Sequence, residues 1–360
     1  MSRELRYEDY TVAWICALPF EATAAIFMLD ELHDGEFPWR SGQESIYTAG
    51  NLNGHNVVIA CLPKGEYAIG AAARVVGQLR LCFPNLTFGL MVGIGAGVPG
   101  PEHDIRLGDV VVGTPEGTSG GCVGYDLGKE TIDGFKLKGW LNATDPVLRS
   151  AIANIEARAG HRGDVFVQYL EVFRRCDPRG RKFLHPGPEN DLLYHTIRIN
   201  ELVDRPVRDR QDPVVHYGLV ASGNEVIKNA ALRDELRDRH DIICFEMEAA
   251  GLMNTLPVAI IRGISDYADS HKNDKWQPYA AATAAAYAKG LLRVIRPDSV
   301  GNIKGGASSV TPLSNPLLEP TCTWMPSASV DLKHIILIFK LKRMPDSYAT
   351  IYTESRFCGA

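Results

Sequence analysis

The sequence predicts a single α/β domain over residues 7–296, because short apolar stretches alternate along it with segments of helical pattern. Residues Thr11–Leu18 are apolar without alternation, which is typical of a strand that is buried on both faces. Pro19 follows at a position that suits the first turn of a helix, and residues 20–29 supply that helix. With 360 residues and 45% hydrophobic content, the chain is long enough to bury such a core.

The same alternation continues to the end of the domain. Residues 45–50 and 56–61 flank the turn sequence Leu-Asn-Gly-His, which predicts a hairpin. The strand expected at residues 87–93 leads into a glycine-rich stretch, Gly93–Gly97, which we interpret as a loop. Further strands are expected at residues 107–113 and 215–221, and further helices at residues 67–81, 145–158, 228–239 and 279–294.

Two regions depart from this alternation. The pattern degrades over residues 114–214, which hold one clear helix and then a polar region, Cys176–Asp212, rich in Arg, Asp and Pro. We interpret residues 114–214 as a long insertion, and we hypothesise that residues 125–129 and the polar region form a lid over a binding site. Ser, Thr, Pro and Gly dominate after Pro297. We therefore expect residues 297–360 to form an irregular, disordered tail, either a linker or a gene-model artefact.

The composition excludes several functional classes. A net charge of −5 and a pI of about 6.1 provide no basic field for a nucleic-acid backbone, so we expect no nucleic acid as a partner. The eight cysteines are scattered without metal or redox spacing, which favours free thiols in a reducing cytosol. The N-terminus resembles no signal peptide, and no apolar run is long enough to cross a membrane. The expected protein is soluble and cytoplasmic, without a membrane partner.

Two motifs that carry carboxylates lie close together in the sequence. The stretch Cys244–Ala250 contains Glu246 and Glu248, and the stretch Arg262–Asp266 ends the next apolar run. We interpret the two motifs as the strand ends of a strand–helix–strand unit. The strands of such a unit are parallel, so the carboxylates would emerge at the edge of the sheet where open α/β sheets bind ligands. One acid would then hold a diol while the other donates a proton, as the cleavage of a nucleoside requires.

Taken singly, most of the candidate residues also have a purely structural explanation. Glu21 stands in the first turn of a helix, where a carboxylate is favourable whatever its function. The Gly93–Gly97 stretch lacks the dinucleotide pattern and the lysine of a P-loop, and a tight turn explains it equally well. Glu246 and Glu248 at a helix start are equally explained as capping charges. Asp266 is harder to dismiss, because an unpaired carboxylate at the end of a central apolar strand is costly.

Together these residues resemble the nucleoside phosphorylase and nucleosidase superfamily, and most closely its fungal branch. The superfamily includes purine and uridine phosphorylases and methylthioadenosine/S-adenosylhomocysteine nucleosidases. The resemblance implies an α/β, three-layer phosphorylase-type fold with a central mixed twisted sheet flanked by helices. The motifs follow the family order over nearly all of residues 7–296, and they are Ala17–Glu21, Cys61–Gly65, Val92–Val98, Asp104–Val112, Ala221–Asn224, Phe245–Ala249, Arg262–Asp266 and Tyr267–Tyr279.

The resemblance also implies a role for each matching residue. Asp266 matches the acid that protonates a purine leaving group, Ser265 orients it, and Glu21 matches the glutamate that activates water in the hydrolytic branch. Glu248 matches the residue that grips the ribose hydroxyls, and Met247 packs beneath the sugar. The family implies homo-oligomers and no metal or organic cofactor. The remaining residues expected to bind the nucleoside are Gly95, Ala96, Ser222, Asn224, Val226, Phe245, Glu246 and Arg262.

The function expected from these residues is hydrolysis of the N-glycosidic bond of a purine nucleoside. The phosphorylase branch carries an arginine and a serine where this chain has Met91 and Ile94, and a Gly-Asp-Pro-x-Arg loop where it has Leu18–Glu21. A glutamate within about 4 Å of phosphate repels each phosphate charge by about 4 kcal/mol at an effective dielectric near 20, which favours water. Val226 stands where an aromatic ring often stacks on the base, which leaves Tyr125 as a candidate for that contact. A phosphorylase and a non-catalytic, nucleoside-sensing module of a fungal receptor-like protein remain as alternatives.

Overall fold

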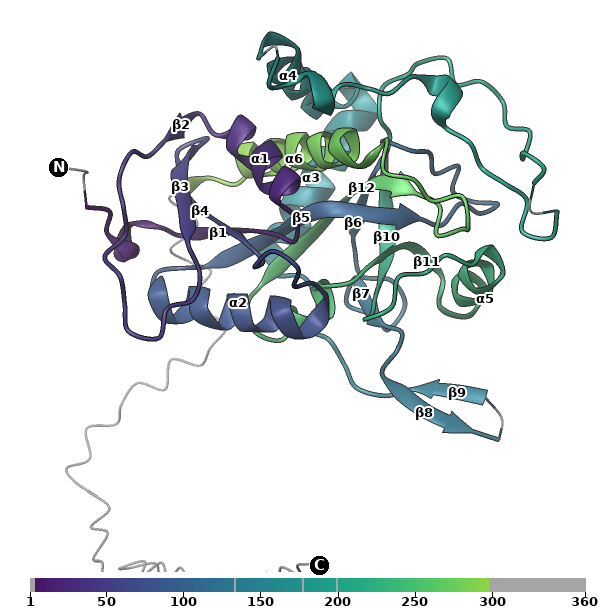
Figure 1. The fold of residues 1–360 in the computed structure, drawn as a ribbon, viewed down its shortest axis with the longest axis horizontal. Coiled ribbons are helices and arrows are strands. Elements are labelled where there is room, and N and C mark those ends of the chain that lie inside the picture. Colours follow the sequence, from purple (N-terminus) through teal and green to yellow (C-terminus); the bar gives the residue numbers. More distant parts are fainter. Residues whose placement is uncertain (1–3, 133, 177, 199, 298–360) are drawn as a thin grey trace, which may run out of the picture. The chain divides into compact units, whose positions relative to one another are not determined.

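One mixed sheet runs through the centre of the protein, and helices cover both of its faces (Figure 1). The computed structural model describes residues 4–132, 134–176, 178–198 and 200–297, so residues 298–360 of the expected tail lie outside the described residues. The strands are β1 (Val12–Cys16), β2 (Glu31–Leu32), β3 (Tyr47–Leu52), β4 (His55–Cys61), β5 (Phe88–Gly97), β6 (Val110–Gly113), β7 (Cys122–Gly124), β8 (Gly128–Thr131), β9 (Gly134–Leu137), β10 (Val215–Ser222), β11 (Ile242–Glu246) and β12 (Val258–Asp266). The α-helices are α1 (Pro19–Met28), α2 (Ala68–Cys82), α3 (Pro146–Arg162), α4 (Glu171–Arg175), α5 (Ala230–His240) and α6 (Gln277–Val294).

Strand β5 is the central strand of this sheet and pairs with three other strands. It pairs in parallel with β1 on one side and with β12 on the other. Beyond β12 the direction reverses, because β6 is antiparallel to β12, and β10 and β11 continue parallel to β6. The C-terminal end of β5 then pairs with β11, where Phe245 lies opposite Ala96, so that five strands close into a ring. On the other side of β1, the strands β4, β3 and β2 extend the sheet to an edge.

This arrangement corrects three expectations from the sequence. Strands β11 and β12 run in opposite directions, since β11 is antiparallel and β12 is parallel to β5. Their carboxylates therefore do not meet as the ends of two parallel strands. The chain between them forms a 3-10 turn at Ala249–Gly251 rather than an α-helix. Gly93–Gly97 is not a loop but the second half of β5, because these residues keep their pairing with β12 and β11.

Most of the other expected elements are confirmed. The hairpin is formed by β3 and β4, and its turn residues Asn53 and Gly54 both have positive φ angles, 51° and 84°. A two-residue hairpin turn requires this conformation, which explains the Asn-Gly pair in the sequence. The remaining expected strands and helices appear, with small shifts at their ends, as β1, β6, β10, α1, α2, α3, α5 and α6.

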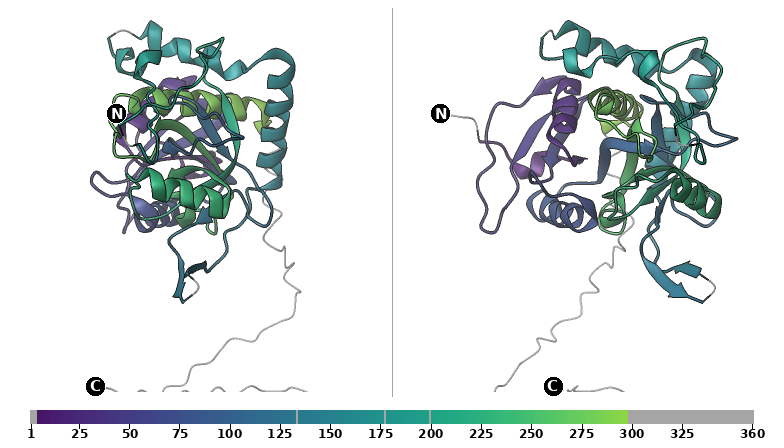
Figure 2. Two further views of the ribbon diagram at one scale, coloured as in Figure 1. Left: turned by 90° about the vertical axis from the view of Figure 1, so that its right-hand side faces the viewer. Right: turned by 45° about the vertical axis from the view of Figure 1, so that its right-hand side comes forward.

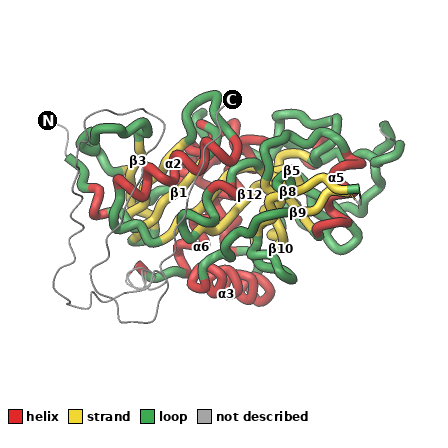
Figure 3. The backbone as a smooth tube through the Cα atoms, turned by 90° about the horizontal axis from the view of Figure 1, so that it is seen from below, coloured by secondary structure: helices red, strands yellow, loops and turns green. Residues whose placement is uncertain are grey.

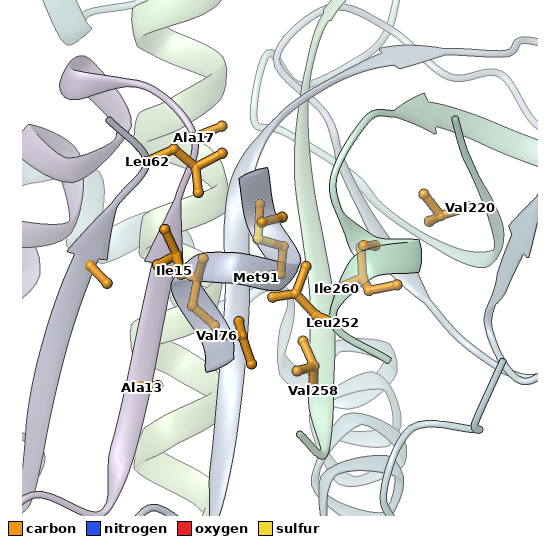
Figure 4. Packing of buried hydrophobic residues seen from close by; sticks show 14 of the residues in the cluster. Ala13, Ile15, Ala17, Leu62, Val76, Met91, Val220, Leu252, Val258 and Ile260 are labelled. Atoms are coloured by element: carbon orange, nitrogen blue, oxygen red, sulfur yellow. The ribbon is translucent and has the colours of Figure 1, made fainter. Parts of the chain in front are cut away.

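Residues of β1 alternate between two apolar layers, which is why the strand is apolar throughout. Val12, Trp14 and Cys16 pack with α1 and α6, whereas Ala13 and Ile15 pack with α2 on the opposite face (Figure 4). Figure 2 shows the two helix layers from further directions, with α1 beside α6 and α2 across the sheet. The sheet is therefore the middle of three layers, and the expected fold class is confirmed.

Helix α6 lies directly on β12 where Gly263 of the strand faces Ala280 of the helix. A side chain at Gly263 would collide with the carbonyl oxygen of Ala280. Alanines also fill the buried face of the helix over Ala280–Ala288. The close contact places the start of α6, and the loop 267–276 before it, at the end of β12.

Residues 114–214 join both the sheet and a helix layer. Strand β7 pairs with β10, and Leu148 and Ile152 of α3 belong to the same apolar layer as α6. Strands β8 and β9 pair only with each other, and this hairpin projects from the body of the domain (Figure 1). Seen from below, α2 and α3 lie on different sides of the strands (Figure 3).

The polar region within 114–214 packs against the loop that follows β12. The Tyr267 hydroxyl donates a hydrogen bond to Asp191. The indole nitrogen of Trp276 donates to the carbonyl oxygen of Asn190 at 3.0 Å. The polar region therefore braces the loop 267–276 from the outside.

None of the helices in the described part of the chain has the length and apolar character needed to cross a bilayer. Within the same residues, no group of three or more His, Cys, Asp or Glu side chains is arranged to hold a metal ion. The cysteines that the structure describes are free thiols.

Candidate active site

A cavity of about 230 Å³ lies at the end of β12, beside the turn after β1 and the turn after β11. Glu248 and Asp266, and Glu21 from a distant part of the sequence, all line this one cavity. The C-terminal end of β5 forms part of the wall through Gly95 and Ala96. The cavity is therefore built from the ends of three separate sequence motifs that the closed sheet brings together. Apart from Ser222 and Asn224, every site residue expected from the sequence lies on its wall.

Ser222 and Asn224 are not among the residues that line the cavity, and their expected contact with a substrate stays a prediction. Ser222 is fully buried at the end of β10, and its hydroxyl oxygen accepts a hydrogen bond from the backbone N–H of Ala250 at 3.0 Å. Asn224 turns toward Asp126, whose carboxylate accepts hydrogen bonds from the backbone and side-chain nitrogens of Asn224 at 2.7 and 2.8 Å. Both side chains stabilise the turns that carry the wall.

Glu21 is a buried carboxylate held by backbone donors. Its Oε2 accepts the N–H groups of Ala17 and Leu18, both at 2.9 Å, and its Oε1 accepts the N–H of Ile94 at 2.7 Å. Burial raises the pKa of the Glu21 carboxyl above its ordinary value, while Arg262 and the backbone donors act in the opposite direction. A carboxylate with a raised pKa is a better base, so Glu21 is suited to take a proton from water.

Arg262, Glu246 and Glu248 form a buried ionic cluster. Arg262 lies in the middle of β12 with its side chain only 1% exposed, and its Nη2 pairs with Glu246 and lies 3.4 Å from Glu248 Oε2. Glu246 also accepts the N–H groups of Glu248 and Ala249, at 3.1 and 2.9 Å, and so holds the turn after β11. Burial raises the pKa of Glu248 to about 7, against the opposing effect of Arg262. Because Glu246 is occupied by the turn, Glu248 is the better placed of the two to accept hydrogen bonds from a ligand.

Asp266 is buried at the end of β12, and it is paired. Its carboxylate accepts hydrogen bonds from the Ser265 hydroxyl at 2.9 Å and from the backbone N–H of Ala268 at 3.0 Å. The ammonium of Lys272 lies 2.9 Å from Asp266 Oδ2. These three donors offset the cost of burying the charge. The sequence interpretation identified Ser265 but not Lys272.

No described residue of 114–214 lines the cavity, so the lid hypothesis stays a prediction that this structure does not support. Tyr125 packs edge-on against the back of Phe245, with ring centroids 5.6 Å apart, and its hydroxyl donates to the carbonyl oxygen of Glu225 at 3.1 Å. It therefore supports Phe245 from outside the cavity, whose lining does not include Tyr125. Phe245 and Val226 line the cavity themselves.

Four polar residues that the sequence analysis did not identify also line the cavity: Tyr67, Glu225, Lys272 and Gln277. Tyr67 precedes α2, and Gln277 begins α6. Lys272 falls within one of the recognised motifs, but it stands in a loop, where a lysine is usually a solvated surface residue. No periodicity or spacing in the sequence marks these positions. Their place on the wall depends on how α2 and α6 pack on the sheet.

The wall has a negative formal charge. It carries five carboxylates, on Glu21, Glu225, Glu246, Glu248 and Asp266, and two cations, Arg262 and Lys272. Each cation is already paired with a carboxylate of the wall. Such a cavity disfavours a small anion as a co-substrate and suits a developing positive charge.

Replacing Gly93 with alanine should damage both stability and the site. A Cβ at Gly93 would lie 2.5 Å from Glu21 Oε1 and 2.9 Å from Arg262 Nη1. The Glu21 side chain cannot move away from the new methyl group without losing hydrogen bonds, because three backbone N–H groups donate to its carboxylate. We expect the free energy of unfolding to fall by about 1–3 kcal/mol, as is typical of overpacking. Urea denaturation measures this change.

The matched control for this substitution is Gly77→Ala. A Cβ at Gly77, in α2, meets no atom within 4 Å. We expect this variant to be stabilised by about 0.5–1 kcal/mol, because alanine favours helix over glycine. Equal effects of the two substitutions would show that crowding at Glu21 is not the cause.

The closed ring of strands between helix layers is the fold of known nucleosidases. A 5′-methylthioadenosine/S-adenosylhomocysteine nucleosidase from Neisseria meningitidis matches 79% of this chain and 99% of its own, with a TM-score of 0.53 and 20% identity. The futalosine hydrolase of Helicobacter pylori matches 80% of this chain and 99% of its own, with a TM-score of 0.54 and 15% identity. The protein therefore has the same fold as these two enzymes, which agrees with the fold that its motifs implied.

Sequence comparison adds curated relatives of two kinds, while no family model matches the chain. A nucleotide-binding leucine-rich repeat (NLR)-like protein from Hyaloscypha variabilis is 44% identical over 81% of this chain. The chain spans about 30% of the length of that relative. The ATP nucleosidase Cap17 of Escherichia coli is 38% identical over 78 residues, which make up 20% of this chain and 15% of Cap17. The chain thus resembles one part of a longer fungal protein.

Proposed function

We propose that this protein hydrolyses the N-glycosidic bond of a purine nucleoside or of its 5′-phosphorylated form. The observation that carries the proposal is the convergence of Glu21, Glu248 and Asp266, three buried carboxylates, on one cavity. Solved nucleosidases and a hydrolase share the fold. The name of the Cap17 relative adds ATP to the candidate substrates.

The proposed mechanism assigns one task to each acid. Cleavage of the bond builds positive charge on the ribose and negative charge on the departing base. Glu248 accepts hydrogen bonds from the 2′- and 3′-hydroxyls, and its charge stabilises the positive ribose. Glu21 takes a proton from the water that attacks C1′, and Asp266 delivers a proton to N7 of the purine. Each acid–base contribution is typically about 10²–10⁴-fold in rate.

The surroundings of Glu21 favour water over phosphate as the nucleophile. Met91 is fully buried in the apolar layer on the α2 face, so its position does not present a side chain to the cavity (Figure 4). The N–H of Ile94 is taken by Glu21 and is not free to bind an anion. A phosphate beside Glu21 would face the negative wall, at a cost of about 4 kcal/mol per close pair of like charges.

Incubation with adenosine, inosine, guanosine, uridine and ATP, with and without phosphate, tests the proposal. We expect release of free purine without phosphate, together with a free ribosyl product, and no release of uracil. Strict dependence on phosphate with formation of ribose 1-phosphate would instead identify a phosphorylase. Failure to release a base from any of these compounds would refute the proposed activity. Light scattering on the same sample tests whether the protein is the expected homo-oligomer.

The pH dependence of kcat/KM should show a limb on the acidic side. Glu248 must be ionised to accept hydrogen bonds from the ribose hydroxyls, and burial raises its pKa to about 7. Because kcat/KM reports the free enzyme, it should decline as the pH falls through about 7, approaching tenfold per pH unit. Steady-state kinetics between pH 5 and 9 measure this profile. A profile that stays flat from pH 8 to pH 5 would contradict the assignment of Glu248.

A second candidate function is a nucleoside-sensing module without catalysis. The NLR-like relative favours it, because the chain spans only about 30% of that longer protein. Isothermal titration calorimetry distinguishes the two functions: a sensor binds the nucleoside, and the nucleoside is recovered intact after binding.

A further inference from the structure

Lys272 is the charged residue beside the candidate acid that the mechanism above does not use. Its Nζ lies 2.9 Å from Asp266 Oδ2, and its side chain lines the same cavity as Glu21. In such an ion pair the carboxylate only accepts hydrogen bonds, and the transferable proton is on the ammonium nitrogen. If the departing purine requires a proton at N7, the available proton is therefore on Lys272. The ammonium of Lys272 contacts Asp266, so Asp266 lies between this proton and the purine.

The two members of the pair differ in their access to solvent. The side chain of Asp266 is 3% exposed, whereas that of Lys272 is 23% exposed. A proton that the pair gives to a base is thus replaced through the lysine. The ammonium carries three donors on a flexible stem, so it can contact Asp266 and exchange with water at the same time.

The position of Lys272 is fixed by its loop. The backbone N–H of Lys272 donates to the carbonyl oxygen of Asp269 at 3.4 Å. One residue before it, His271 stacks on Tyr194 of the polar region, with ring centroids 3.6 Å apart. Further along the loop, Trp276 is tied to the polar region by its indole hydrogen bond. The insertion therefore braces the loop on both sides of the lysine and keeps the ammonium at the cavity.

We propose that Lys272 is the proton source for the departing purine and that Asp266 relays the proton; this inference rests on the hydrolytic function proposed above. The proton moves from Nζ to Asp266 Oδ2, and the carboxyl group gives a proton to N7 as the C1′–N9 bond breaks. The electron pair of that bond goes to the base, which leaves as a neutral purine. The oxygen of water bonds to C1′, and the proton of that water goes to Glu21. Glu21 has then gained one proton and Lys272 has lost one, and exchange with solvent restores both.

Two variants, Lys272→Met and Lys272→Arg, test the proposal with two substrates. The first substrate is the purine nucleoside that the wild-type protein cleaves best. The second is 4-nitrophenyl β-D-ribofuranoside, whose leaving group departs without protonation. We expect both variants to lose about 10²–10⁴-fold in kcat on the purine nucleoside, because neither methionine nor a guanidinium releases a proton. Both should cleave the nitrophenyl riboside at close to the wild-type rate, which also shows that they are folded.

Lys275→Met is the matched control. Lys275 lies in the same loop, is exposed, and its Nζ lies 3.4 Å from Asn190 Oδ1. We expect this variant to have wild-type rates on both substrates.

Four outcomes would overturn the assignment of Lys272. An equal loss on both substrates would assign the lysine a structural role. A Lys272→Arg variant that keeps its rate on the purine nucleoside would show that charge, and not a proton, is what Lys272 supplies. An unaffected Lys272→Met variant would refute the assignment while the proposed function stands. A wild-type protein that releases no purine would refute the function and this inference together.

Discussion

Asp266→Asn should reduce the release of purine by about 10²–10⁴-fold in kcat, the typical contribution of general acid catalysis. An amide cannot carry a proton from the ammonium of Lys272 to the base. Asparagine has nearly the same shape as aspartate, and its amide oxygen can still accept the N–H of Ala268, which lies 3.0 Å from Asp266 Oδ1. We therefore expect the fold and nucleoside binding to survive. Chromatography of the free base at saturating substrate measures the loss, and a thermal unfolding curve checks the fold.

The control for this substitution is Asp238→Asn. The side chain of Asp238 is 71% exposed, and it pairs with Arg237 on the surface of α5. We expect it to have no effect on kcat, since exposed ion pairs contribute little. If Asp266→Asn releases purine as fast as the wild-type protein, the catalytic assignment of Asp266 is wrong.

Glu21→Gln should slow hydrolysis by about 10²–10⁴-fold, because glutamine cannot take a proton from water. The substitution also has a structural cost. Both carboxylate oxygens accept backbone N–H groups, so the new amide nitrogen must face at least one of them, from Ala17, Leu18 or Ile94. A buried donor left without an acceptor costs about 1–3 kcal/mol. Single-turnover kinetics and urea denaturation measure the two effects separately.

The same experiment is repeated with added phosphate, which distinguishes a hydrolase from a phosphorylase, and with a surface variant as the control. If the protein is a hydrolase, added phosphate should not restore the activity of Glu21→Gln. If it is a phosphorylase, loss of the negative charge should leave the phosphate-dependent rate unchanged or increase it. Glu235→Gln is the matched control, because Glu235 is 56% exposed in α5 and pairs with Arg239. We expect this control to keep wild-type activity with and without phosphate.

Local sequence signals predicted most of the elements of the fold. The continuous apolar run of β1 indicated burial on both faces, and the structure places its residues alternately in two apolar layers. Pro19 marked the start of α1, and Asn53-Gly54 marked the turn between β3 and β4. Each of these signals depends on neighbouring residues alone, which is why single-sequence reasoning could find them.

Local sequence signals predicted less of the candidate site than of the fold. The roles of Glu21, Glu248 and Asp266 were assigned through motifs that resemble a family, and no spacing in the chain joins Glu21 to the other two. Lys272 was missed, because nothing local distinguishes it from the exposed Lys275 three residues later. Ser222 was assigned to the wall of the cavity, yet its hydroxyl is used to hold the turn at Ala250.

The sequence by itself determined where most of the strands and helices of the main sheet and its helix layers lie, which residues are apolar enough to form the core, and which carboxylates are candidates for chemistry. The tertiary structure alone decided that β11 runs against β12, that Gly93–Gly97 continues β5, and that Lys272 pairs with Asp266. The physical reason is the closure of the sheet. An apolar strand has the same local pattern whether its neighbour is parallel or antiparallel, and the pairing is decided between residues more than a hundred positions apart.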